Sequence, residues 1–342
     1  MRTVDLRSDT LTRPTEEMRR YMMGAEVGDD VFAEDPTINR LQEKIAQLSG
    51  KEAALFVTSG TQGNQVCINA HTQPGQEIIL DRNAHIANYE CGAPAMLAGV
   101  QLHTIEGKNG IITAEQVERA LRPPDDHYPQ TGLICLENTH NRAGGVIYPL
   151  EEIRRISELA RRKKLPLHLD GARLWNASAA TGISIAEYCR YFDSVSLCFS
   201  KGLGAPVGSI VVGDREFIKR AHFYRKAYGG GIRQGGILAA AALFALEHHL
   251  PLLKEDHRRA RLLAEGIAGL PAISVDFAAV QTNILIFEVD PKKITADALV
   301  KKLGEQGVKM FTFGPTRIRA VAHLEISDED IEYAIGVFKR VL

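Results

Sequence analysis

The chain has 342 residues, a length at which one large domain plus a smaller one is expected, and its 45% hydrophobic and 24% charged residues are typical of globular proteins. Its 41 lysines and arginines nearly balance 42 aspartates and glutamates, so the net charge of -1 argues against nucleic acid or an anionic membrane surface as the main partner. No apolar run is long enough to cross a bilayer, and the polar N-terminal segment is unlike a secretory signal or a transit peptide, so we expect a cytoplasmic protein without membrane association.

Short apolar runs alternate with amphipathic stretches from Ala53 to about Gly213. This alternation predicts an α/β fold of three layers, in which helices cover both faces of a mostly parallel seven-stranded sheet. Ligands of such sheets bind beyond the carboxyl ends of the strands. The predicted strands are 53–57, 77–80, 101–105, 133–137, 167–170, 194–199 and 209–212, and the predicted helices include 61–71, 113–121 and 150–163.

The pattern changes after Gln234. Two helices divided near Pro251 are expected first, followed by a strand-rich segment over 273–289. A helix over 295–306, a strand over 317–322 and a capped helix over 327–342 complete the chain. We therefore predict a large domain over residues 1–245 and a smaller α+β domain over residues 246–342.

The predicted strand 53–57 passes into a helix at Thr58-Ser59-Gly60-Thr61. Backbone amides and hydroxyls at a helix N-terminus can bind a phosphate, helped by the positive end of the helix dipole. The segment matches neither the Walker A motif nor the GxGxxG fingerprint. Taken alone, it is therefore interpreted more readily as a capped glycine turn.

A carboxylate, Asp170, ends the predicted strand 167–170. Burying it is costly unless a cation meets it, and that cation is either Arg173 or a protonated ring nitrogen of a ligand. His168 and Asp170 share one side of the strand, as in a metal pair, but neither has a third ligand nearby in the sequence.

Five scattered cysteines without a CxxC pair indicate a reducing compartment. We predict no metal site.

Lys201 follows the apolar run SVSLCFS and is flanked by Gly202 and Gly204. The ordinary interpretation is a surface lysine in a turn; the alternative is a desolvated, nucleophilic amine beside a bulky ligand. Lys201 lies about one βαβ step after Asp170, so both would face the same sheet edge as the phosphate-binding turn. A ligand with a phosphate, an aldehyde and a basic ring nitrogen suits these partners, and that ligand is pyridoxal 5'-phosphate (PLP), held as an imine on the lysine. His85, after another strand end, either stacks on the ring or is an ordinary loop residue.

Motifs from nearly the whole chain belong to one pattern: DLRSDTLTRPTEEM, LENTHNRAGGVIYPLEEI, LHLDGARLWNA, SKGLGAPVGSIVVGD and RAVAHLEIS. They resemble the motifs of the low-specificity L-threonine aldolases, PLP enzymes of the aspartate-aminotransferase-like fold, called fold type I. The RSDT and ENTHN runs are the most specific. The resemblance implies retro-aldol cleavage of L-threonine or L-allo-threonine, and of related β-hydroxy-α-amino acids, to glycine and an aldehyde.

The resemblance also implies roles for particular residues. Lys201 would carry the cofactor, Asp170 would pair with its ring nitrogen, and His85 would stack on the ring. The base that takes the β-hydroxyl proton would be His85, His127 or an ordered water. The implied cofactor-binding residues are Ser59, Gly60, Thr61, His85, Asp170, Arg173, Ser200, Lys201, Lys226 and Arg233, and the implied substrate-binding residues are Ser8, Arg173 and Arg319.

Association of subunits is implied as well. Lys226 and Arg233 would reach the phosphate of a neighbouring subunit, so a dimer, and further a dimer of dimers, is expected. The first 14 residues would form an arm that contributes to the active site. Two alternatives stay open: another fold-type-I enzyme, such as a β-eliminating lyase, an aminotransferase or a serine hydroxymethyltransferase, and a cofactor-binding protein without catalytic activity.

Overall fold

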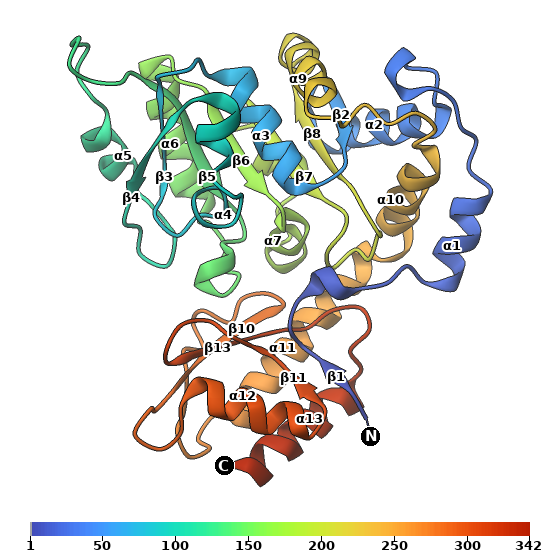
Figure 1. Ribbon diagram of the computed structural model, residues 1–342, viewed down its shortest axis with the longest axis vertical. Coiled ribbons are helices and arrows are strands. Elements are labelled where there is room, and N and C mark those ends of the chain that lie inside the picture. Colours follow the sequence, from blue (N-terminus) through green and yellow to red (C-terminus); the bar gives the residue numbers. More distant parts are fainter. Residues whose placement is uncertain (1) are drawn as a thin grey trace.

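The computed structural model describes residues 2–342 and contains the predicted mostly parallel sheet of seven strands, in the order β2-β8-β7-β6-β5-β3-β4 (Figure 1). Only β8 is antiparallel to its neighbours, β2 and β7, so β2 runs in the same direction as the parallel strands. The strands are β2 (Ala53–Val57), β3 (Glu77–Asp81), β4 (Gln101–Ile105), β5 (Thr131–Glu137), β6 (Leu167–Gly171), β7 (Ser194–Cys198) and β8 (Ser209–Gly213), which confirms all seven predicted strands to within two residues.

Helices cover both faces of this sheet, as predicted. On one face, β-strand residues such as Ile134 and Leu169 share a hydrophobic cluster with Ile38 of α2 and Ile156 of α6. On the other face, Val66 of α3 and Phe217 of α9 pack with strand residues of β2 and β8. The helices are α1 (Glu16–Met23), α2 (Pro36–Ser49), α3 (Gly60–His71), α4 (His85–Asn88), α5 (Ala114–Ala120), α6 (Leu150–Lys163), α7 (Leu174–Thr181), α8 (Ile185–Cys189), α9 (Arg215–Ala227), α10 (Gly236–His248), α11 (Leu253–Ile267), α12 (Ala296–Glu305) and α13 (Asp328–Val341).

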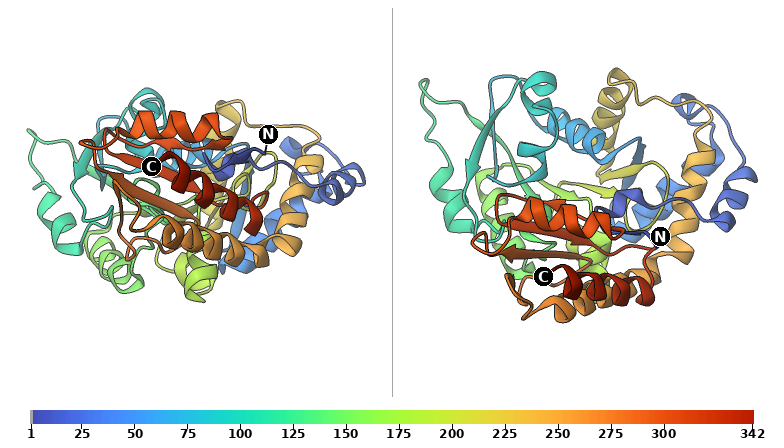
Figure 2. Two further views of the ribbon diagram at one scale, coloured as in Figure 1. Left: turned by 90° about the horizontal axis from the view of Figure 1, so that it is seen from below. Right: turned by 60° about the horizontal axis from the view of Figure 1, so that its bottom comes forward.

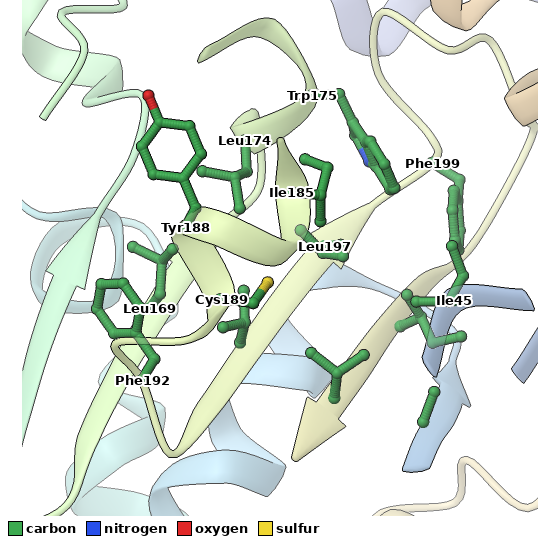
Figure 3. Packing of buried hydrophobic residues seen from close by; sticks show 14 of the residues in the cluster. Ile45, Leu169, Leu174, Trp175, Ile185, Tyr188, Cys189, Phe192, Leu197 and Phe199 are labelled. Atoms are coloured by element: carbon green, nitrogen blue, oxygen red, sulfur yellow. The ribbon is translucent and has the colours of Figure 1, made fainter. Parts of the chain in front are cut away.

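The strands that carry the predicted site residues are buried on both faces. Every residue of β6 and of β7 is buried, including the polar ones. Figure 3 shows part of the cluster that fixes them, where Tyr188 and Cys189 of α8 lie against Leu169 of β6 and Leu197 of β7. Such packing leaves the strands little freedom to shift, so the residues at their carboxyl ends are held in fixed positions.

The C-terminal part of the chain forms a separate lobe beneath the sheet (Figures 1 and 2). It contains an antiparallel sheet in the order β12-β13-β10-β9, on which α11, α12 and α13 pack. The N-terminal strand β1 joins this lobe, because it pairs in parallel with β11 and places Val4 and Leu6 in the lobe's hydrophobic cluster. The strands are β1 (Val4–Asp5), β9 (Ile273–Val275), β10 (Ile284–Val289), β11 (Val308–Lys309), β12 (Phe311–Thr312) and β13 (Arg317–Val321).

The transition between the two parts runs through α10 and α11. The predicted break near Pro251 is confirmed, since a short 3-10 turn over Leu250–Leu252 separates the two helices. The division into domains at residue 245 falls inside α10 and stays a prediction. Within residues 2–342, no helix by itself has the length and apolar character to span a membrane; α10 joined to Leu250–Ile267 meets that criterion only as a pair bent by 51°, on length and composition alone.

Candidate active site

A cavity of about 420 Å³ opens where the carboxyl edge of the seven-stranded sheet faces the C-terminal lobe. Its walls come from the N-terminal segment, the ends of β5 and β6, the loop after β7, and the strands β12 and β13. Six of the residues predicted from the sequence line it: Ser8, His85, Asp170, Arg173, Lys201 and Arg319. The structure thus brings together residues that are spread over more than three hundred positions of the chain.

Asp170 lies near the end of β6 and is only 3% exposed. One carboxylate oxygen accepts a hydrogen bond from Asn64 Nδ2 at 2.9 Å and the other accepts from the backbone N–H of Ala172 at 3.1 Å. The ion pair with Arg173 that the sequence allowed is absent here, because Arg173 has a different partner. His168 also contacts Asn64, through Nε2 at 3.2 Å, and burial lowers its pKa to about 4, so this histidine is neutral. The carboxylate of Asp170 is therefore held by neutral donors and forms no ion pair with a lysine or arginine among residues 2–342.

The backbone around Lys201 is fixed from both sides. Thr12 Oγ1 donates to the carbonyl of Lys201 at 2.9 Å, and His249 Nδ1 lies 2.7 Å from the carbonyl of Leu203. Gly204 adopts a φ of +76°, and a Cβ there would come within 3.4 Å of the His249 ring. The glycine noted in the sequence is thus explained by the left-handed turn and the close approach of His249. The half-buried amine of Lys201 lines the cavity.

Arg173 forms a buried, two-pronged ion pair with Asp9, a residue that sequence reasoning missed. Its Nε and Nη2 donate to the two carboxylate oxygens at 2.8 and 2.7 Å, and Asn283 Nδ2 adds a third bond at 3.2 Å. Burial acts to raise the pKa of Asp9, but the charge and hydrogen bonds of Arg173 hold that pKa far below its usual range, so Asp9 is ionised. Asp9 binds the Nε and Nη2 groups of the Arg173 guanidinium, so the Nη1 group is the donor that remains for a ligand in the cavity.

Arg319, on β13, has a free donor. Its Nη1 donates to Asn141 Oδ1 at 3.0 Å and its Nη2 donates to the carbonyl of Arg7 at 3.1 Å. Its Nε is buried and has no partner among residues 2–342. The guanidinium lies over the ring of Phe313, 5.1 Å from the centroid. Burial and the nearby Arg173 lower the pKa of Arg319, an arrangement that favours binding of an anion.

His85 begins α4 and is held by two carboxylates. Its backbone N–H donates to Glu137 Oε2 at 2.6 Å, and its Nδ1 lies 2.9 Å from Glu90 Oε1. Burial acts to lower the pKa of His85, but the hydrogen bond with Glu90 and the charges of Asp170, Glu90 and Glu137 raise it on balance. Glu90, only 1% exposed, was also missed by the sequence analysis.

The predicted phosphate-binding turn forms the N-terminus of α3. The Ser59 hydroxyl caps the helix by accepting from the N–H of Gln62 at 3.1 Å, and the helix begins at Gly60 with Thr61 next. Beside Gly60 lies the Ser209 hydroxyl, which is buried without a hydrogen-bond partner in the described part of the chain. A bound anion would satisfy both the hydroxyl and the first N–H groups of the helix.

The remaining predicted residues do not line the cavity of their own chain. Ser200 lies next to Lys201, with its hydroxyl 3.4 Å from Cys198 Sγ. The His127 side chain is 87% exposed and its Nδ1 contacts Asp125 at 2.6 Å. Lys226 is exposed at the end of α9, and Arg233 pairs with Asp29 at 2.9 Å. The roles expected of Ser200 at the cofactor, of His127 at the substrate hydroxyl, and of Lys226 and Arg233 at a neighbour's phosphate stay predictions.

Comparison with known proteins adds three findings. The model of the beta-eliminating lyase family matches residues 5–290. Low-specificity L-threonine aldolase 1 of Arabidopsis thaliana is 46% identical over 347 residues, covering 100% of this chain and 97% of that protein, and the low specificity L-threonine aldolase of Escherichia coli K12 is 42% identical over 329 residues, covering 96% of each. The solved structure of a threonine aldolase from Leishmania major superposes with a TM-score of 0.86 at 20% identity, covering 98% of this chain and 99% of that one, which shows a common fold.

Proposed function

Because the chain belongs to the beta-eliminating lyase family and, within it, to the low-specificity L-threonine aldolases, we propose that it cleaves L-threonine and L-allo-threonine to glycine and acetaldehyde with the help of PLP. The observation that carries the proposal is the meeting of Lys201, Asp170 and the two arginines around one cavity. A cofactor-binding protein without activity would need none of the substrate-binding arginines.

The residues present fit PLP. Lys201 offers the amine that the aldehyde of PLP requires. Asp170 offers a buried carboxylate that forms no ion pair within the described part of the chain, and such a group is suited to a protonated ring nitrogen. The N-terminus of α3 with the unpartnered Ser209 hydroxyl suits the phosphate. When bound, the cofactor supplies an electron-accepting ring conjugated to the substrate's amino group.

The chain's own residues would bind and orient the substrate. The free Nε of Arg319 and the remaining edge of Arg173 each offer the α-carboxylate a donor, and Ser8 lines the same wall. A carboxylate fixed in this way sets the direction of the Cα–Cβ bond. Phe311 and Phe313 line the same cavity and add apolar surface to its wall.

The base is proposed to be His85. Of the three candidates from the sequence, it is the histidine that lines the cavity of its own chain, while His127 lies on an exposed loop. His85 would take the β-hydroxyl proton as the Cα–Cβ bond breaks and the aldehyde forms. A proton delivered to Cα then completes glycine.

Incubation with L-threonine tests the reaction directly. The PLP-loaded protein is expected to release acetaldehyde and glycine in equal amounts, because retro-aldol cleavage divides threonine into these two products. Coupled reduction of acetaldehyde with NADH and chromatographic assay of glycine measure both. Formation of a 2-keto acid without acetaldehyde would instead identify a β-eliminating lyase or an aminotransferase.

Replacing Arg319 with alanine is expected to raise the KM for L-threonine about 10- to 100-fold, because a charge-assisted contact with the carboxylate is lost. The absorption spectrum of the PLP-loaded protein without substrate is expected to stay unchanged. Arg317→Ala is the matched control, since Arg317 lies on the same side of β13 but outside the cavity, 3.9 Å from Glu288. A bleached or shifted spectrum in the substrate-free Arg319 variant would contradict a role limited to the substrate.

A homo-oligomer, at least a dimer and by expectation a dimer of dimers, is part of the proposal. Large apolar side chains on the surface support it, among them Met23 at 87% and Phe32 at 69% exposure. Lys226 and Arg233 would then reach a neighbour's phosphate. The cytoplasmic location is proposed from the cysteines, all five of which are free.

A further inference from the structure

The carboxylate of Glu90 is buried next to the His85 imidazole and does not line the cavity. The Glu90 side chain has no exposed surface, and its oxygens receive hydrogen bonds from Asn64 Nδ2 at 2.8 Å and Gln65 Nε2 at 2.6 Å, both on α3. His85 Nδ1 lies 2.9 Å from the same oxygen that accepts from Asn64. The amide nitrogens of Asn64 and Gln65 can only donate, so each Glu90 oxygen already accepts one hydrogen bond from α3.

The charges around His85 are unequally distributed. Ligand atoms of His85, Glu90 and Asp170 all lie within 4.8 Å of one another, and Asn64 Nδ2 donates to both carboxylates. Glu137, on β5, accepts from the His85 backbone. The cations of the cavity are Lys201, Arg173 and Arg319, and the phenol of Tyr89 packs against the imidazole, with the ring centroids 5.5 Å apart. The ionisable groups that the structure places closest to the imidazole are thus the carboxylates of Glu90 and Asp170.

The contact with Glu90 also decides where the ring hydrogen lies. Both Glu90 oxygens already accept hydrogen bonds from side-chain amides, so we assign the hydrogen of this contact to His85 Nδ1, which donates it to Glu90 Oε1. In the neutral ring, Nε2 is then the acceptor. His85 lines the cavity, so its second nitrogen is the one available to a substrate.

We propose that Glu90 is the positioning residue of His85: it holds the ring hydrogen on Nδ1, keeps Nε2 free to accept the β-hydroxyl proton, and balances the charge of the imidazolium that results. This inference rests on the proposed function. The substrate's O–H bond breaks and an Nε2–H bond forms. The electron pair left on oxygen becomes the second bond of the aldehyde carbonyl as the Cα–Cβ bond breaks, and the proton taken from oxygen balances the one that Cα receives.

Glu90→Gln tests the proposal through the pH dependence of kcat/KM for L-threonine. Loss of the negative charge lowers the pKa of His85, so the ring stays neutral to lower pH and the acid limb of the profile moves down by about 1 pH unit. Because Nε2 of His85 becomes less basic, the plateau value of kcat/KM above the acid limb is also expected to fall about tenfold. Glu77→Gln is the matched control, because Glu77 is equally buried and lies 3.0 Å from Nδ1 of His103, at the amino end of β3 and outside the cavity. Its profile is expected to match that of the unaltered enzyme.

A double-mutant cycle separates positioning from a purely structural role. In a His85→Asn background, Glu90→Gln is expected to cause no further loss and no shift, because the residue acts through His85. An equal loss in both backgrounds, or an unshifted profile in the single variant, would overturn the proposal. If Glu90→Gln does not fold, Glu90→Asp, which withdraws the carboxylate from Nδ1 by one methylene, must move the acid limb in the same direction.

A measurement without turnover keeps this inference apart from the proposed function. In protein labelled with ¹⁵N-histidine, the resonances of His85, assigned by their absence in His85→Asn, are expected to show hydrogen on Nδ1 and a pKa that falls in Glu90→Gln. Hydrogen on Nε2 in the neutral ring would overturn the proposal whether or not threonine is cleaved. Absence of acetaldehyde together with the expected resonances would overturn the proposed reaction and not the pairing of Glu90 with His85.

Discussion

Replacing Lys201 with alanine is expected to remove the visible absorption of the lysine-bound cofactor and to lower threonine cleavage at least about 10⁴-fold. The amine is the group proposed to bind the cofactor aldehyde, and among the described residues it is the lysine that lines the cavity. The fold should survive, because the bond from Thr12 reaches the backbone carbonyl of Lys201 and not its side chain. Absorbance after addition of PLP, kcat and the melting temperature measure the three effects.

The control for this variant is Lys301→Ala, an exposed lysine on α12 outside the cavity. It should leave absorbance and turnover unchanged. Lys201→Ala protein that keeps both its bound cofactor spectrum and its turnover would show that another amine carries the cofactor, and the assignment of the cavity would then be wrong.

The strands and their ends could be predicted from the sequence, because both depend on local patterns and on general rules of sheet topology. The predicted strand 53–57 is β2, and the predicted helix 150–163 is α6, with the same bounds. Parallel strands bring their carboxyl ends to one edge, so Asp170 and Lys201 were expected at the same edge once their strands were recognised. The adjacency of β6 and β7 then brings both residues to one cavity. Burial of both faces of β3, β5 and β8 made these strands recognisable in the sequence as short, mostly apolar runs.

Contacts between distant segments could not be predicted in this way. Asp9 and Arg173 are 164 residues apart, and nothing in the RSDT motif indicates which cation its aspartate meets. Glu90 is close to His85 in the sequence, yet its burial depends on Asn64 and Gln65 of α3, so the sequence alone presents it as an ordinary loop acid. Asp9 contacts the predicted site residue Arg173, and Glu90 contacts His85. No sequence motif marks residues that support a site residue in this way.

Replacing Asp170 with asparagine is expected to lower kcat about 10²- to 10³-fold and to weaken PLP binding, because a neutral amide cannot hold the cofactor's ring nitrogen in its charged form. The geometry should be kept, since asparagine can still accept a hydrogen bond from the backbone N–H of Ala172 or from Asn64. Turnover at saturating cofactor, and the dissociation constant of PLP, measure the two effects. The control is Asp193→Asn, at the opposite edge of the sheet, where the carboxylate accepts from the N–H of Leu167 at 2.7 Å.

The same substitution should separate stability from activity. Asp170 and Glu90 are two buried carboxylates that share the single amide nitrogen of Asn64, so they repel each other in the protein without its cofactor. Removing one charge relieves that repulsion, and the melting temperature of cofactor-free Asp170→Asn is expected to equal or exceed that of the unaltered chain. A lower melting temperature would mean that Asp170 is retained for folding. A variant that is at least as stable without cofactor, and yet far less active when loaded with PLP, would mean that the chain carries this charge for the cofactor, at a cost to its own stability.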